Sequence, residues 1–399
     1  MHTRTVLQKF FQCSLPSIHT RRLRSLQAAV DAVMNGASVS VTGMGRHLRS
    51  SARIKHNVKR IDRLVGNQHL HNERKLLYAM MSNWLLKSIE QPLILIDWSP
   101  FSKDGKQQLL RAAIPVGGRS MTLYEELHPA GKLGNREVQH RFLSTLKALL
   151  PSACQPIIIA DSGFRVPFYL YVESMGWHWL GRIRGRDYIA WQAREGDWFC
   201  AKDLYTQAKC KPTRLGVVNW VRSRPLQACL FLVREPQRGR HAISAAGQRR
   251  FSRHSLKNAR REREPWLLVT SCSLSTYSAA CIVKLYKSRM QIEENFRDTK
   301  SASYGLGVAR ENRTTLKRAE NLLLISALAT VILWANGAFA IAQKLHQLVS
   351  VNSSSTRPSY SVIYTARLLI KYTRLKLPAS CINKTQRHIR RYTQELLCQ

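Results

Sequence analysis

Apolar residues between Arg21 and Tyr78 recur at steps of three and four positions, which is the spacing of an amphipathic α-helix. The first series contains Leu23, Leu26, Val30 and Val33, and Gly36 ends it. A second helical stretch follows Thr42. The pattern therefore predicts a helical N-terminal region.

Beyond residue 90 the pattern changes to short apolar runs bounded by turn residues. These runs predict strands over 92–97, 106–116, 120–127, 156–161 and 179–184, and amphipathic spacing predicts helices over 135–150 and 166–175. Gly117 and Gly118 mark a turn between two of the strands. Three meandering strands followed by helix, strand, helix and strand form a mixed α/β sheet with helices on both faces. This order is the ribonuclease H-like topology.

From about Arg186 to Glu264 the helical spacing is lost, and alternating runs over 215–221 and 228–233 predict a β-rich insertion with a basic loop. A buried strand over 266–272 follows, and then one long helix that begins near Ser275. The rest is mostly helical. The pattern divides the chain into a helical domain 1–85, a core 86–185, the insertion 186–264, a second core part 265–314, and a helical C-terminal region 315–399 that could serve dimerisation.

Charge changes this picture more than any other bulk property. The 399 residues include 63 Lys and Arg but only 24 Asp and Glu, which gives a formal charge of +39. Such an excess repels itself unless a polyanion neutralises it, so nucleic acid is the favoured partner. The charge is concentrated between residues 46 and 63, where Asp62 is the single acid among the bases Arg46, Arg49, Arg53, Lys55, Lys59, Arg60 and Arg63. A solvated helix face is the plain alternative, but the absence of alternating acids favours a DNA-binding surface.

Two other features limit the function classes. The nine cysteines have no Cys-x-x-Cys pair, which argues for a reducing compartment and against a structural zinc site, and no signal peptide is evident. Residues Leu322 to Ala342 carry no charge over a length that could span a bilayer. Polar residues dilute this stretch, so a buried helix is favoured and no membrane partner is expected.

The segment from Tyr286 to Lys300 carries the most specific chemistry. On one continuous helix at about 100° per residue, Arg289, Glu293 and Lys300 would lie roughly 60°, 20° and 40° to one side of Tyr286. A carboxylate beside a phenol, a guanidinium and an ammonium suits a phosphate diester held next to a metal ion. Glu294 lies about 100° from Glu293 and is assigned to the surface or to a salt bridge.

Two further carboxylates, Asp97 and Asp161, each close an apolar strand run. An acid at the carboxyl end of a strand lies at the edge where open α/β sheets bind ligands. Turn-forming or capping roles are the plain alternative for each acid. Together with Glu293 they form an oxygen-only set that suits two Mg²⁺ or Mn²⁺ ions, and therefore phosphoryl transfer on DNA.

These motifs resemble a known family. The spacing Tyr-x2-Arg-x3-Glu-x6-Lys is typical of insertion-sequence transposases of the cut-and-paste, hairpin-forming kind, which carry an Asp-Asp-Glu triad. The resemblance extends through residues 56–64, 96–99, 119–125, 161–164 and 290–294. Within the family, the chain looks most similar to the transposases of composite transposons such as the tetracycline-resistance one. Least resemblance is seen after about Ser350.

The resemblance implies that Asp97, Asp161 and Glu293 bind the metal ions, and that Tyr286, Arg289 and Lys300 hold DNA phosphates. It also implies that Trp266 stacks on a base flipped out when the hairpin forms, although packing at a strand start is an equal alternative. The implied protein is a bacterial, cytoplasmic enzyme that acts on double-stranded transposon ends and target DNA, as a homodimer in the synaptic complex.

Three other functions stay open on the sequence. A metal-dependent nuclease or resolvase would use the same carboxylates without strand joining. A non-catalytic DNA-binding derivative is disfavoured because all three acids are present, and a membrane-associated basic protein would depend on the stretch from Leu322 to Ala342. The terminal-repeat sequence, the target-site preference, the host, the activity of this copy and its oligomeric state without DNA do not follow from the residues.

Overall fold

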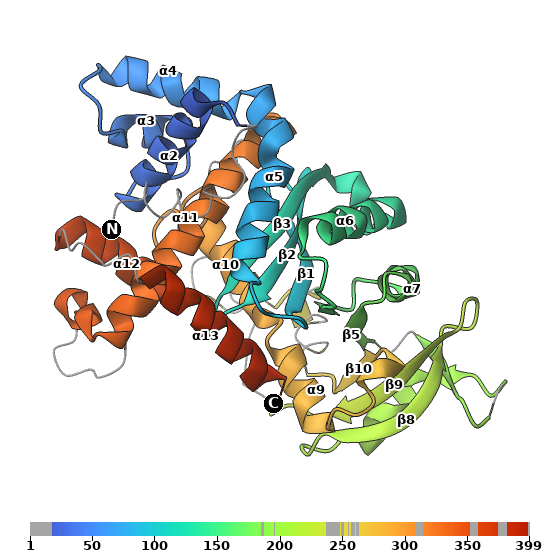
Figure 1. The fold of residues 1–399 in the computed structure, drawn as a ribbon. Helices are drawn as coiled ribbons and strands as arrows, with labels where there is room; N and C mark the ends of the chain where they lie inside the picture. Colours follow the sequence, from blue (N-terminus) through green and yellow to red (C-terminus); the bar gives the residue numbers. More distant parts are fainter. Residues whose placement is uncertain are drawn as a thin grey trace. The chain divides into compact units, whose positions relative to one another are not determined.

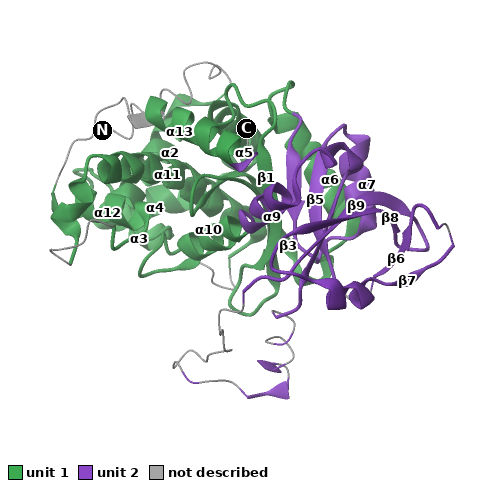
Figure 2. Cartoon of the chain, turned by 90° about the horizontal axis from the view of Figure 1, so that it is seen from below, with its two compact units in different colours: residues 1–154, 290–395 green, residues 155–289, 396–399 purple. Residues whose placement is uncertain are grey.

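The computed structural model describes residues 18–184, 187–194, 196–236, 263–308, 314–351, 358–373 and 381–397, with isolated positions between 248 and 260. The chain forms two compact units, coloured separately in Figure 2. Unit 1 comprises residues 1–154 and 290–395, and unit 2 comprises residues 155–289 and 396–399. The chain thus leaves unit 1 after Cys154 and returns to it at Met290.

Unit 1 begins with the predicted helical region, which contains α2 (Thr20–Met34), α3 (Val41–His47), α4 (Ile54–Val65) and α5 (Gln68–Leu85) (Figure 1). Local chemistry sets their ends. The Ser40 side chain caps α3 by accepting from Gly43 N at 3.0 Å, and Asn67 caps α5 by accepting from Leu70 N at 2.9 Å. Gly36, with φ of 104°, ends the turn after α2.

Three antiparallel strands follow, β1 (Leu93–Pro100), β2 (Gln107–Pro115) and β3 (Ser120–Pro129). The turn between β2 and β3 has positive φ at both Gly117 (89°) and Gly118 (72°). Two central residues with positive φ match the right-handed twist of a hairpin, and glycine adopts them without a steric penalty. The predicted glycine turn is therefore confirmed.

Helices cover both faces of these strands. Tyr124 of β3 stacks on Phe142 of α6 (Arg136–Leu149), with ring centroids 5.3 Å apart. Arg111 of β2, the partner of Glu125 in the ladder, instead hydrogen-bonds to Asn295 of α10 (Met290–Lys300). Because adjacent residues of a strand face opposite sides, α6 and α10 lie on opposite faces.

The free edge of β3 is also covered. Ser82 and Arg74 of α5 donate to the carbonyls of Leu123 and Glu125, at 3.0 and 2.9 Å. Glu320 of α11 (Leu316–Ala342) accepts from Leu127 N at 3.0 Å. Unpaired strand edges invite pairing with other chains, so these contacts satisfy and protect the edge.

Helix α11 is the long apolar segment that the sequence singled out. It is long and apolar enough to cross a membrane, yet 89% of its most hydrophobic window is buried inside the protein. The interpretation as a buried helix is confirmed by this packing. Two more helices follow, α12 (Val362–Tyr372) and α13 (Cys381–Leu396).

Unit 2 continues the order predicted for the core. Strand β4 (Ile157–Ala160) is parallel to β5 (His178–Ile183), with α7 (Val166–Ser174) between them. On its other edge β5 pairs with β10 (Trp266–Thr270), which pairs with β9 (Leu226–Val233). The insertion adds β8 (Thr213–Trp220), β6 (Tyr188–Trp191) and β7 (Phe199–Cys200), and helix α9 (Ala279–Lys287) follows β10.

The predicted mixed α/β class, the ribonuclease H-like order of elements and the β-rich insertion are confirmed. The sequence pattern does not predict β6 and β7. Most of the basic segment 234–263 lies outside the described residues. The five-part domain division stays a prediction.

Candidate active site and nucleic-acid surface

Asp97 lies inside β1 rather than at its end. The strand continues through Pro100, so Asp97 is paired with Arg111 of β2 and is only 5% exposed. The expectation of a strand-end position was wrong, because Trp98, Ser99 and Pro100 extend the ladder with β2. One carboxylate oxygen, Oδ1, accepts from the backbone N–H of Trp98 at 2.8 Å, which holds the side chain against its own strand.

Asp161 follows β4 directly, in unit 2, as the sequence predicts. Its Oδ1 accepts from Gly163 N at 2.8 Å and forms a turn of the kind that Asp side chains favour. The side chain is half-buried. The turn over 161–164 thus presents a carboxylate at the carboxyl end of a buried parallel strand.

Glu293 and Lys300 share one face of α10. Seven helical positions separate them, which places them about 20° apart around the axis. Lys300 Nζ donates to Ser99 Oγ at 2.6 Å and to Pro100 O at 2.5 Å, both at the end of the strand that carries Asp97. Its ammonium also lies 5.2 Å from the centre of the Phe296 ring. The face of α10 that bears Glu293 therefore adjoins β1, and Glu293 itself is exposed.

The four-residue stripe of the sequence does not lie on one helix. Tyr286 belongs to α9 and Arg289 to the turn after it, both in unit 2, whereas Glu293 and Lys300 belong to α10 in unit 1. Arg289 N bonds to Tyr286 O, three residues back, at 3.0 Å. Ser288 Oγ also donates to Leu285 O at 2.6 Å, a side-chain bond that competes with the regular helix ladder. The expectation of one continuous helix was wrong for this reason.

Trp266 is the first residue of β10, and its ring contacts the side chains of Tyr286 and Arg182, all in unit 2. The Tyr286 ring meets it edge-on, with centroids 5.3 Å apart, and Arg182 Cζ of β5 lies 5.6 Å from its ring centre. Burial lowers the pKa of the Arg182 guanidinium, which remains cationic at neutral pH. Sequence reasoning missed Arg182, because a basic residue inside a strand run gives no sign of an aromatic partner.

A buried ionic network, also missed, joins β2 to α10. Arg111 Nη2 lies 2.6 Å from Glu125 Oε2, and both side chains are almost completely buried. Arg111 Nη1 donates to Asn295 and, at 3.1 Å, to Thr299 Oγ1, while Tyr78 OH donates to Glu125 Oε1 at 3.0 Å. The network fixes α10 on the strand that lies next to β1.

The three predicted acids offer oxygen donors only, which fits hard divalent cations such as Mg²⁺ or Mn²⁺. Unit 1 supplies Asp97 and Glu293, and unit 2 supplies Asp161. Among the described residues, no group of three or more His, Cys, Asp or Glu side chains that could hold a metal ion is found. Each unit taken by itself provides at most two of the three ligands.

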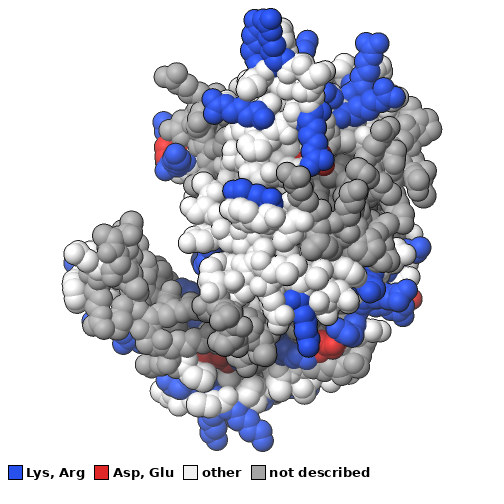
Figure 3. Space-filling model, turned by 90° about the vertical axis from the view of Figure 1, so that its left-hand side faces the viewer, with Lys and Arg blue, Asp and Glu red and all other residues white. Residues whose placement is uncertain are grey.

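The basic stretch 46–63 lies on α3, α4 and their connection. Asn57, Ile61, Leu64 and Val65 of α4 are buried, whereas six of the seven predicted DNA-binding bases are exposed and Arg60 is half-buried. Lys55, Lys59 and Arg63 lie roughly opposite the buried side of α4. Asp62 is paired with Arg318 of α11. Figure 3 shows a face of the protein on which blue Lys and Arg side chains are far more numerous than red acids.

The family of this chain follows from comparison with known proteins. No curated protein matches the chain. A cryo-EM structure described as the piggyBac transposase synaptic complex with hairpin DNA is 10% identical, and the alignment covers 99% of this chain and 81% of that chain with a TM-score of 0.42. A family model described as the transposase DDE domain matches residues 89–332, which is more than half of the chain. The chain therefore belongs to the family of DDE-type transposases.

Proposed function

We propose that this protein excises an insertion sequence by cleaving DNA at the terminal inverted repeats through hairpin ends, and joins the resulting 3′ ends to target DNA. The observation that carries this proposal is the shared face of Glu293 and Lys300 beside β1, the strand of Asp97, within a chain of the DDE transposase family. In this proposal, excision and joining take place in the bacterial cytoplasm. The likeness to the transposase of the tetracycline-resistance composite transposon is part of the same proposal.

In this proposal Asp97, Asp161 and Glu293 hold two Mg²⁺ or Mn²⁺ ions. Bound divalent ions would activate a water or a 3′-hydroxyl and stabilise the leaving oxygen of a phosphodiester. Lys300, Arg289 and Tyr286 bind phosphates next to the cleaved bond. Trp266, with Arg182 and Tyr286 around its ring, offers a stacking surface for an extruded base.

The exposed bases of α3 and α4 bind the terminal repeats in this scheme. Their charges are distributed along a helix face whose other side is packed into unit 1, as expected for a helix that lies against DNA. Two ends must be paired before joining, so we propose a homodimer in the synaptic complex. A nuclease without strand joining remains the second candidate, because it would need the same carboxylates.

The test is Glu293→Gln, with Glu294→Gln as the matched control. Glu294 accepts a hydrogen bond from Arg297 of α10 at 3.0 Å and lies 3.5 Å from Arg119 of the β2–β3 turn. Its carboxylate therefore has ion-pair partners within the protein. With Mg²⁺ and a DNA that carries the element's terminal repeat, Glu293→Gln should bind the DNA but lose strand cleavage by at least about 10³-fold. Glu294→Gln should cleave within about tenfold of the unmodified protein.

Cleavage by Glu293→Gln at the unmodified rate would contradict the assignment of Glu293. Hairpin ends followed by joined products support the transposase. Hydrolysed ends without hairpins or joining would favour the nuclease.

A further inference from the structure

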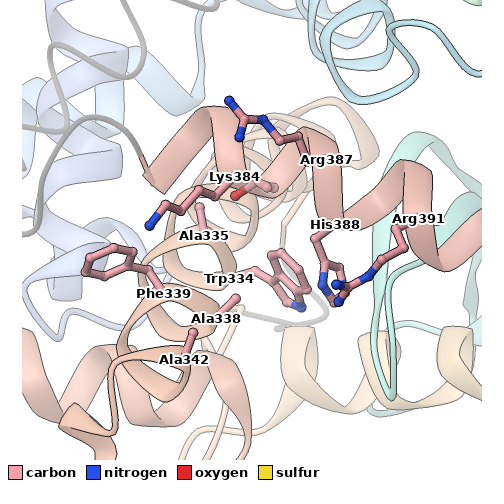
Figure 4. Close-up of a pocket in the computed structure, with 10 residues that line it drawn as sticks. Trp334, Ala335, Ala338, Phe339, Ala342, Lys384, Arg387, His388 and Arg391 are labelled. Carbon is pink, nitrogen blue, oxygen red and sulfur yellow. The ribbon is translucent and has the colours of Figure 1, made fainter.

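The C-terminal helix α13 packs against the body of unit 1. His388 approaches Trp334 of α11, with ring centroids 5.0 Å apart, and the two residues point toward each other in Figure 4. Gln386 Nε2 donates to Trp84 O, at the end of α5, at 2.8 Å. Together with Lys384, whose ammonium lies 5.0 Å from the Phe339 ring centre, these contacts fix α13 on α11 and α5.

The next turn of α13 holds the glycine turn of the β2–β3 hairpin. His388 Nε2 donates to Val116 O at 3.1 Å. The rings of His388 and Tyr392 are nearly parallel, at 9°, with centroids 6.2 Å apart. A side-chain carbon on Gly117 would meet both rings, at 3.7 Å from His388 Nε2 and 3.8 Å from Tyr392 Cε2. The backbone of this turn therefore rests on two aromatic side chains of α13.

Gln291 connects that turn and α13 to the helix of Glu293. Its Oε1 accepts from Val116 N at 3.1 Å and from Gly117 N at 3.0 Å, and its Nε2 donates to Tyr392 OH at 2.7 Å. Gln291 is only 8% exposed. It is the second residue of α10, two positions before Glu293 and about 200° away around the axis. Its buried amide thus anchors the side of α10 opposite Glu293.

The first turn of α10 depends on such contacts. Gln291 lies in this first turn, so its side-chain bonds to Val116, Gly117 and Tyr392 help to hold the turn in place. Farther along, Arg119 Nε bonds to Asp298 Oδ2 at 2.7 Å, and Arg111 binds Asn295 and Thr299. In the first turn, Arg119 also lies 3.5 Å from Glu294. We call the set formed by Gln291, Val116, Gly117 and Tyr392 the Gln291 clamp, because it joins the start of α10 to α13.

We infer that α13 is a positioning element for Glu293, and that Tyr392 acts on the reaction by holding Gln291. This inference rests on the proposed function, in which Glu293 is a metal ligand. A displacement of about 1 Å in a reacting group can reduce a rate about 10²-fold, so a helix start that is held less firmly should slow cleavage without weakening DNA binding.

The experiment compares Tyr392→Phe, Gln291→Met and Gln291→Glu with the control Tyr372→Phe in the full-length protein. Tyr392→Phe removes one hydroxyl and keeps the ring. Gln291→Met keeps the length but removes both polar functions, whereas Gln291→Glu retains an acceptor for the two N–H groups and for the Tyr392 hydroxyl. Tyr372 is 66% exposed on α12, so its hydroxyl serves as a surface comparison.

Hydrogen exchange without metal gives the first readout. Tyr392→Phe should speed amide exchange in residues 290–294 and 116–120 about three- to tenfold, as expected for the loss of one hydrogen bond. Gln291→Met should do so more strongly, while Gln291→Glu and Tyr372→Phe should stay within about twofold of the unmodified protein. Thermal melting checks that each variant is folded.

Cleavage of pre-bound ends gives the second readout. Tyr392→Phe and Gln291→Met should cleave about 10- to 100-fold more slowly at unchanged end affinity, with Gln291→Glu rescuing most of the loss. If the amide-exchange rates and the cleavage rates of both Tyr392→Phe and Gln291→Met equal those of the unmodified protein, the inference is overturned. If even the unmodified protein does not cleave, the proposed function fails, whereas the exchange data still decide whether α13 holds the start of α10.

Discussion

At the scale of single residues, Asp298 shows how burial and pairing compete on the helix of Glu293. Burial is the largest influence and raises the pKa of Asp298 to about 6, with Glu294 adding to the rise, although Arg119 and Arg297 oppose it. Arg119 Nε lies only 2.7 Å from Asp298 Oδ2. The short ion pair therefore offsets only part of the cost of removing the carboxylate from water.

This balance predicts a pH-dependent contribution to stability. An unfolded Asp has a pKa of about 3.9, so the folded protein binds this proton more tightly. The resulting stabilisation is complete below about pH 4 and is lost as the pH rises through about 6, and it amounts to roughly 3 kcal/mol. In Asp298→Asn this component should be absent.

The measurement is the unfolding free energy of both proteins from pH 4 to pH 7, taken as the difference between them. That difference removes the titration of all other carboxyl groups. The unmodified protein should lose stability relative to Asp298→Asn as the pH rises across this interval. A difference that does not change with pH would contradict the raised pKa of Asp298.

Which residues the sequence could reveal depends on how far their partners lie along the chain. The shared helix face of Glu293 and Lys300 could be predicted because helical spacing relates them within one segment, and the strand-end position of Asp161 because it closes an apolar strand run. Arg111 and Gln291 could not, since their partners Asn295, Val116 and Tyr392 come from elements that only the fold brings together. A buried arginine also looks like a solvated one until its burial is known.

At the scale of elements, the crossing of α3 and α4 depends on one glycine. A Cβ on Gly45 would lie 2.6 Å from Val58 Cα and 2.9 Å from Val58 N. Backbone atoms cannot move aside as a flexible side chain can. The two helices that carry the basic stretch therefore approach closely because residue 45 has no side chain.

We expect Gly45→Ala to destabilise the N-terminal helices by about 1–3 kcal/mol, as overpacking does, and to weaken binding to the terminal repeat. Gly131→Ala is the control, because a Cβ there meets nothing within 4 Å. Thermal melting and a binding titration measure the two effects. Equal melting of Gly45→Ala and Gly131→Ala would show that α3 and α4 can separate without cost.

Most elements could be read from the sequence because their periodicity is local. Strands β2 and β3 and helix α6 begin within one residue of the prediction, and Gly117 and Gly118 form the predicted turn. The break between α9 and α10 could not be read, because no glycine or proline marks it and a serine side-chain bond contributes to it. Strands β6 and β7 were missed because they are short and have little alternation.

At the scale of the whole molecule, the charge of +39 should make the affinity for DNA depend strongly on salt. Neutralising phosphates releases condensed counterions, so log K should fall linearly with log salt, by about 0.9 for each contact. If six to ten phosphates are contacted, affinity should drop about 10³- to 10⁵-fold between 50 and 200 mM salt. Uncharged contacts to bases would not give this slope.

The surface that produces the slope can be located with single substitutions. Lys59, opposite the buried side of α4, should contact a phosphate, so Lys59→Ala should weaken binding to all sequences and reduce the slope by about 1. Lys147, exposed on α6, carries the same charge, and Lys147→Ala should leave the slope unchanged. Filter binding over a salt series distinguishes the two. Equal slopes for both variants would mean that the net charge alone attracts DNA, and that α4 has no particular part in binding.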